Sequence, residues 1–289
     1  MRLNPFDPNS IRVRRGAGGG GDGMGPGTMG CGGLIVVLIG VFLFGADPQQ
    51  MIGMVQGGQQ SAPTEQQGAS NESAAEICDD NAYATEACSA LASLDQTWAP
   101  LFQEANIEFA QPQLIFYQGG TSSGCGAASS AMGPFYCPPD QGIYIDTSFY
   151  DQMARQMGAG GDFARYYVMA HEYGHHIQHL TGLADQIRSA QSQNPSSANQ
   201  LQVRMELQAD CYAGVWAGRN RNLIEPGDFE EGMTAANAIG DDTLMRGAGQ
   251  SVNQESFTHG SSAQRMEWLQ RGIQTGDEDQ CDTFADMRR

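Results

Sequence analysis

The chain has 289 residues, with 33 acidic and 15 basic side chains and a formal net charge of −18 at pH 7. All the basic residues are arginines, and they form no cluster beyond the first fifteen positions. A nucleic-acid-binding protein needs a basic surface, so we expect no nucleic-acid partner. The length suffices for one large domain or two small ones with a real core, and a single long apolar stretch excludes a multi-span membrane protein.

The first 75 residues read as three segments. Residues 1–30 are rich in Gly, Pro and Arg, and we expect them to be disordered. Residues 31–46 are uncharged and strongly apolar, and with Met29 and Gly30 they reach the lower limit of about 17 residues for a transmembrane helix. A buried helix or a cleaved signal peptide is the alternative, and cleavage stays open. Residues 47–75, rich in Gln, Gly, Ser and Ala, predict a flexible tether.

Charge and cysteine usage predict where the chain resides. Four of the arginines precede the apolar run and no basic residue follows it closely, so the positive-inside rule places the N-terminus in the cytoplasm. We therefore expect a single-pass protein of the cell membrane, whose folded domain, residues 76–289, is periplasmic or extracellular. Six cysteines lie in that domain, and an even number outside the cytoplasm indicates disulfides. The favoured pairs, among 15 possible pairings, are Cys78–Cys88, Cys125–Cys137 and Cys211–Cys281.

The domain should be of the α+β class, mainly helical with a small sheet. Apolar periodicity and turn residues predict strands and helices in alternation along the first part of the domain, and mostly helices after it. We expect helix over 75–109, broken near Pro100, strands at 113–117 and 142–146, and helices at 148–157, 162–181, 199–219 and 262–271.

A metal-binding pattern lies on the helix predicted over 162–181. His171 and His175 are four residues apart, so both imidazoles project from one helix face toward a single ion. Glu172 flanks the same ion and can take a proton from a metal-activated water. This is the H-E-x-x-H signature of zinc peptidases. His176 is rotated about 100° from His175 and is not expected to share the ion, whereas His179 is a minor candidate ligand.

The third ligand is expected from the helix over 199–219. Glu206 can reach the ion from there, and Asp210, one turn later, can accept the N–H of a ligand histidine and fix its tautomer. The apolar residues around both acids indicate a buried helix, where a carboxylate is costly unless it is paired or metal-bound.

Four stretches together resemble the bacterial neutral zinc metallopeptidase family, small single-span proteins with a zincin-type domain. They are Ser130–Cys137, Ala170–His176, Glu206–Gly214 and Phe257–Ser261. The resemblance implies that His171, His175 and Glu206 bind Zn²⁺ in the manner of gluzincins and that Glu172 is the base. It supplies no substrate beyond a peptide or protein.

These features predict a membrane-anchored zinc metallopeptidase, an enzyme of the hydrolase class and an endopeptidase. His259 is our candidate donor to the oxyanion, as the resemblance to zincins implies, with Arg265, Tyr144 and Tyr212 as competitors. If the strand at 142–146 is the edge strand above the zinc helix, it would hold the substrate by β-addition. Two other functions stay open: a non-catalytic zinc-binding envelope scaffold, and a zinc amidase acting on cell-wall peptides. The oligomeric state is not determined by these patterns.

Overall fold

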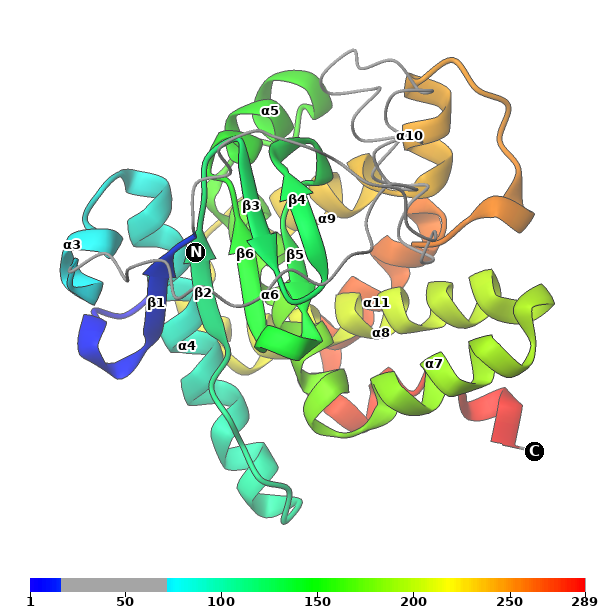
Figure 1. Ribbon diagram of the computed structural model, residues 1–289, viewed down its shortest axis with the longest axis horizontal. Coiled ribbons are helices and arrows are strands. Elements are labelled where there is room, and N and C mark those ends of the chain that lie inside the picture. The colour runs from blue at the N-terminus through cyan, green and yellow to red at the C-terminus, as the bar shows by residue number, and fades with distance from the viewer. Residues whose placement is uncertain (17–71, 289) are drawn as a thin grey trace.

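A computed structural model describes residues 1–16 and 72–288. Over these residues the chain has the α+β class expected, with mostly helical structure and two small sheets (Figure 1). The helices are α3 (Ala74–Cys78), α4 (Ala82–Glu104), α5 (Ser148–Met157), α6 (Asp162–Leu180), α7 (Leu183–Gln193), α8 (Ala198–Arg219), α9 (Asp228–Ala238), α10 (Asp241–Gly247) and α11 (Ser262–Thr275).

The larger sheet has four strands in the order β1-β2-β6-β5. β2 is parallel to both β1 and β6, whereas β5 runs antiparallel to β6. A separate hairpin pairs the remaining two strands. The strands are β1 (Arg12–Arg15), β2 (Gln113–Phe116), β3 (Gly120–Ser123), β4 (Gly126–Ser129), β5 (Phe135–Cys137) and β6 (Gly142–Ile145). β6 is therefore interior, which corrects the idea that residues 142–146 form the edge above the zinc helix; β5 is the edge strand on that side.

The N-terminal segment belongs to the sheet, and this corrects the expectation of disorder over residues 1–16. β1 pairs in parallel with β2, with Arg12 opposite Gln113 and Arg15 opposite Phe116, at one edge of the sheet (Figure 1). Paired strands lie about 4.8 Å apart, whereas the hydrocarbon core of a bilayer is about 30 Å thick. The pairing favours one side of any membrane for both residues 1–16 and the domain, whereas the expected single-pass arrangement with a cytoplasmic N-terminus stays a prediction.

The other predictions for the first 75 residues fall largely outside the described part. The expected transmembrane helix at 31–46 and most of the tether at 47–75 are not among the described residues. Within the described ranges, no helix has the length and apolar character needed to cross a bilayer. Ser73 caps α3 and accepts from the Glu76 N–H, so the helical domain begins slightly before residue 76.

Most predicted elements are present with small shifts at their ends. The exception is the break expected near Pro100: α4 continues through this proline to Glu104, and the interruption lies at residues 79–81 instead. Trp98, Leu101 and Phe102 flank Pro100 and are all buried. Their packing stabilises the last turns of α4 despite the missing N–H of the proline.

The three predicted disulfides are confirmed. Sulfur–sulfur bonds join Cys78 to Cys88, Cys125 to Cys137 and Cys211 to Cys281. The first ties α3 to α4, and the second connects the β3–β4 hairpin region to the end of β5. The third fastens the C-terminal segment to α8. Of these bridges, the one from Cys211 lies closest in sequence to the metal-site acids, since Asp210 precedes it.

Two close helix contacts place the site. α6 packs on α8, and α8 packs on α11. A Cβ at Gly174 would lie only 2.8 Å from the Ala209 Cα, so the glycine inside the H-E-x-x-H motif lets α6 and α8 approach closely. A Cβ at Gly272 of α11 would lie 2.1 Å from the Cys211 carbonyl oxygen. Both contacts bring side chains of three helices toward the same point.

Candidate metal centre

The three predicted ligands converge between α6 and α8. His171 Nε2 lies 3.1 Å and His175 Nε2 lies 3.4 Å from Glu206 Oε2. One ligand atom from each of these residues falls within 4.8 Å of the others. His171 and Glu206 are buried, and His175 is partly exposed, which leaves one side of the group open to a further ligand.

Each candidate ligand is oriented by a second polar side chain. His171 Nδ1 is 2.8 Å from Asp210 Oδ1, as the sequence predicts. His175 Nδ1 is 2.9 Å from Gln178 Oε1, and Gln202 Nε2 donates to Glu206 Oε1 at 2.7 Å. The two glutamines were missed by sequence analysis, because an amide next to a metal motif has no spacing signature of its own. Such partners hold the ligand in the orientation that metal binding requires.

Asp210 is the centre of a buried charged network. Arg265 of α11 donates to both of its carboxylate oxygens, at 2.9 and 2.8 Å, and Tyr167 donates to Oδ1 at 2.6 Å. Burial opposes ionisation, but the charges of Arg265 and His171 lower the pKa of Asp210 to about 2. Asp210 is therefore ionised and can only accept, so it takes the N–H of His171 Nδ1.

The donor set fits zinc. With Nδ1 of each histidine facing an acceptor, each Nε2 faces a carboxylate oxygen. Two ring nitrogens and a carboxylate oxygen that converge in this way favour a positive charge between them, supplied by a metal ion or by a proton. The same preference appears in the pKa of His171: burial opposes protonation, but Asp210 and Glu206 raise this pKa to about 9. Two imidazoles and one carboxylate with an open side are the ligands of a catalytic zinc.

Glu172 lies beside this group on α6 and is 8% exposed. Burial raises the pKa of its carboxyl above the ordinary range, although the nearby His171 and His175 partly oppose this effect. A carboxylate whose pKa is moved toward neutrality is a better proton acceptor at neutral pH than an exposed one. The position and environment of Glu172 are those that a general base requires.

His259 approaches the site from the loop before α11. Its Nε2 lies 3.8 Å from Glu206 Oε2, and its Nδ1 lies 3.0 Å from Thr258 Oγ1. Burial lowers the pKa of the imidazole, although the charge of Glu206 opposes this change. His259 is the only predicted site residue outside α6 and α8. The structure brings it next to the candidate ligand Glu206. The neutral imidazole can donate one N–H there.

The competing candidates are occupied elsewhere. The guanidinium of Arg265 is committed to Asp210. Tyr144 donates to Asp140 at 2.5 Å and stacks on Phe135 in the sheet. Tyr212 packs edge-on against Trp98 of α4.

The two remaining histidines of α6 do not join the ligand group. His176 Nε2 donates to the Ala110 carbonyl at 2.7 Å, and its Nδ1 accepts from Tyr136 at 2.9 Å. Burial lowers its pKa to about 4. His176 therefore bonds away from the three candidate ligands, as expected. His179 packs near the ring of Tyr136 and is not among the converging ligands of the described residues.

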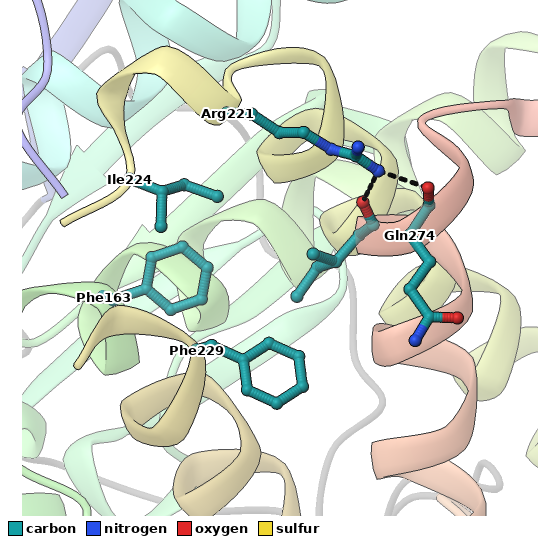
Figure 2. A pocket seen from close by; sticks show the side chains of 6 residues that line it. Phe163, Arg221, Ile224, Phe229 and Gln274 are labelled. Atoms are coloured by element: carbon teal, nitrogen blue, oxygen red, sulfur yellow. Dashed lines mark hydrogen bonds between the residues drawn. The ribbon is translucent and has the colours of Figure 1, made fainter. Parts of the chain in front are cut away.

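An acidic group and a pocket elsewhere in the described residues lack the ligand set of this site. The carboxylates of Asp162 and Asp228 accept from the amino group of Met1 at 3.0 and 2.7 Å, and the nearby Glu231 accepts from the Phe163 N–H at 3.1 Å. A pocket of about 520 Å³, shown in Figure 2, holds none of the candidate catalytic residues. It is lined by Phe163, Arg221, Ile224, Phe229, Ile273 and Gln274.

Comparison with known proteins agrees with this site. The chain is 44% identical over 286 residues to the Escherichia coli K12 protein named "Uncharacterized protein YpfJ", covering 96% of each chain. It is 42% identical over 206 residues to "Uncharacterized protein Rv2575" of Mycobacterium tuberculosis H37Rv, covering 67% of this chain and 68% of the relative. No solved structure matches. The profile of one family matches residues 6–284, nearly the whole chain. The chain therefore belongs to the family described as "Putative neutral zinc metallopeptidase".

Proposed function

We propose that this chain is a zinc-dependent peptidase that hydrolyses peptide bonds with Glu172 as general base. The observation that carries the proposal is the convergence of His171, His175 and Glu206 next to this buried carboxylate. When bound, zinc polarises the scissile carbonyl and lowers the pKa of a coordinated water. Glu172 accepts the proton of the attacking water and returns it to the leaving amine. His259 donates a hydrogen bond to the developing oxyanion.

The substrate is an extended peptide or protein segment, in our proposal. β5 is the outer strand of the four-stranded sheet on the side of α6, and Tyr136 of β5 bonds to His176 of α6. An extended chain can add to such an edge through main-chain hydrogen bonds. This assigns to β5 the role that the sequence suggested for the strand at 142–146.

We also propose that the domain works outside the cytoplasm. Three disulfides favour an oxidising compartment. Because β1 is paired with β2, residues 1–16 share that compartment. The apolar residues 31–46 remain the proposed membrane contact. In this proposal the chain before them and the chain after them lie on the same side of the membrane.

Glutamine at position 172 tests the central claim. Glu172→Gln keeps the three ligands and removes the base, so we expect full zinc content and no hydrolysis in a digest of a peptide library by the purified full chain. Glu267→Gln, at an exposed position of α11, is the matched control and should cut like the parent. Equal cleavage by the parent and Glu172→Gln would exclude Glu172 as the base. Zinc binding without cleavage of any peptide by the parent would favour the envelope scaffold instead.

A further inference from the structure

Two buried glutamines connect the candidate ligand His175 to the C-terminal segment. Gln178 is 0% exposed and Gln208 is 5% exposed. Gln178 lies one turn after His175 on α6, and Gln208 lies on α8, two residues after Glu206. Full burial of an amide is costly unless its donors and acceptors are satisfied, and here they form a continuous chain of hydrogen bonds.

The direction of these bonds is determined by backbone carbonyls. The amide nitrogen of Gln208 faces the Cys281 carbonyl oxygen at 3.1 Å, and that of Gln178 faces the Met205 carbonyl oxygen at 2.7 Å. A carbonyl oxygen only accepts, so both NH₂ groups are assigned without ambiguity. The oxygen of Gln208 then accepts from Gln178 Nε2 at 3.0 Å.

The same logic sets the tautomer of His175. With its NH₂ group turned to Met205 and Gln208, Gln178 presents its oxygen to His175 Nδ1 at 2.9 Å. An amide oxygen only accepts, so Nδ1 carries a hydrogen, and in the neutral ring the lone pair is then on Nε2. Nε2 lies on the side of Glu206, 3.4 Å from Oε2.

We infer that Gln178 and Gln208 are positioning residues that act in series to hold His175 in its metal-binding tautomer, an inference that rests on the proposed zinc site. The series of hydrogen bonds ends at the Cys281 carbonyl, whose segment is attached to α8. Cys281 is bonded to Cys211 of α8, and Thr283 Oγ1 donates to the Arg204 carbonyl at 2.8 Å. The carbonyl that orients Gln208 is thus fastened to the helix that carries Glu206.

The two histidines are consequently oriented by different chemistry. His171 donates to an ionised carboxylate, whereas His175 donates to a neutral amide. An amide fixes the ring without adding a negative charge to a site that already contains Glu172, Glu206 and Asp210. In addition, the bond from Gln178 to the Met205 carbonyl joins α6 to α8 one residue before Glu206. One side chain therefore positions one ligand and the backbone next to another.

The test is zinc affinity of the full chain, measured by competition with a chromophoric chelator. Methionine matches glutamine in length and flexibility and cannot make these hydrogen bonds. We expect Gln178→Met to weaken zinc binding about 10- to 100-fold, the usual effect of losing such a partner. Gln208→Met should weaken it less. Gln193→Met, on the exposed end of α7, is the control and should bind like the parent.

A double variant separates positioning from general packing. If Gln208 acts through Gln178, the combined variant binds zinc no more weakly than Gln178→Met alone; a further loss of affinity would overturn the series. Zinc affinity of Gln178→Met equal to that of the control would overturn the whole proposal.

A spectroscopic measurement keeps the test independent of zinc and of catalysis. In metal-free protein, long-range ¹H–¹⁵N spectra should show the Nδ1–H tautomer for His175 and a mixture of tautomers in Gln178→Met. The Nε2–H tautomer in the parent would contradict the proposal even if the protein cleaves peptides. Conversely, the Nδ1–H tautomer in a parent that cleaves nothing would leave the positioning intact and refute only the peptidase function.

Discussion

Asp241 holds the backbone of His259. The Oδ2 atom of Asp241 accepts from the His259 N–H at 2.7 Å and from the N–H groups of Thr258 and Gly260 at 2.8 and 2.9 Å. Asp241 is 1% exposed, so this single oxygen satisfies three donors inside the protein. Asp241, the first residue of α10, therefore shapes the loop that brings His259 to the candidate ligands. No sequence motif described above includes this contact.

Replacement of His259 should show whether it stabilises the oxyanion. We expect His259→Ala to lower kcat by roughly 10²- to 10³-fold with KM little changed, because the hydrogen bond forms only in the transition state. Zinc content should stay that of the parent, measured after dialysis. Asp241→Ala should lower kcat as well, but cause no further loss when His259 is already alanine. A parental kcat in His259→Ala would show that this residue is catalytically silent.

Removal of Glu206 and of Asp210 should affect zinc differently. Glu206→Ala deletes a ligand, so zinc should be lost on dialysis, whereas Glu255→Ala, at an exposed position, should retain it. Asp210→Ala should weaken zinc about 10- to 100-fold. It should also lower the free energy of unfolding by about 3–5 kcal/mol, because Arg265 is left buried without its partner.

Adding Arg265→Met to Asp210→Ala separates the two effects. The double variant should regain part of the stability in urea unfolding, since the unpaired charge is gone, while zinc binding stays weak. Full zinc in Glu206→Ala would place the third ligand elsewhere, with His179 or Asp210 as the next candidates.

Asp95 should make stability depend on pH. Burial raises the pKa of this carboxyl from 3.8 to about 7, although Tyr173 and Gln111 donate to it at 2.7 and 3.0 Å. Between pH 4 and 7 the folded state therefore keeps a proton that the unfolded state has released. Stability should fall as the pH rises through this window, because the buried group must ionise, and level off above it.

The measurement compares Asp95→Asn with the parent in urea unfolding at several pH values. The amide does not ionise, so the variant should gain stability relative to the parent by up to about 4 kcal/mol between pH 4 and 7.5, given about 1.4 kcal/mol per pKa unit. Asp185→Asn, at an exposed site, should follow the parent throughout. Parallel curves for Asp95→Asn and the parent would mean that Asp95 has an ordinary pKa.

The pairing of β1 with β2 predicts that the N-terminal segment and the helical domain are equally accessible. Asn9 and Ser189 are both exposed. In a Cys31→Ser background, Asn9→Cys and Ser189→Cys should react alike with a membrane-impermeant maleimide in intact cells, before and after permeabilisation. Labelling of only one of the two in intact cells would contradict the pairing of β1 with β2 and place the N-terminal segment and the domain on opposite sides of the membrane.

The sequence predicted the residues whose chemistry follows from local spacing. His171 and His175 share a face because they are one helical turn apart, and the disulfide pairs follow largely from proximity along the chain. The convergence of Glu206 was also anticipated, since a buried carboxylate needs a partner.

What was missed depends on contacts between distant elements. Gln178 orients His175 only because the Met205 carbonyl of another helix fixes its amide. Nothing in the local sequence marks Asp241, because its role depends on the backbone N–H groups of residues 258–260. β1 contains three arginines in four residues, and its partner begins about a hundred positions later, so neither composition nor local pattern identified it as a strand.

The position of β1 has a consequence for biosynthesis. Arg12 leaves the ribosome before its partner Gln113, which is made about 5–20 seconds later at usual elongation rates of about 5–20 residues per second. During that time the buried side chains of Met1 and Ile11 have no core to enter. β1 therefore cannot nucleate the sheet, although it is made before the other strands. It can pair only after β2 has been synthesised.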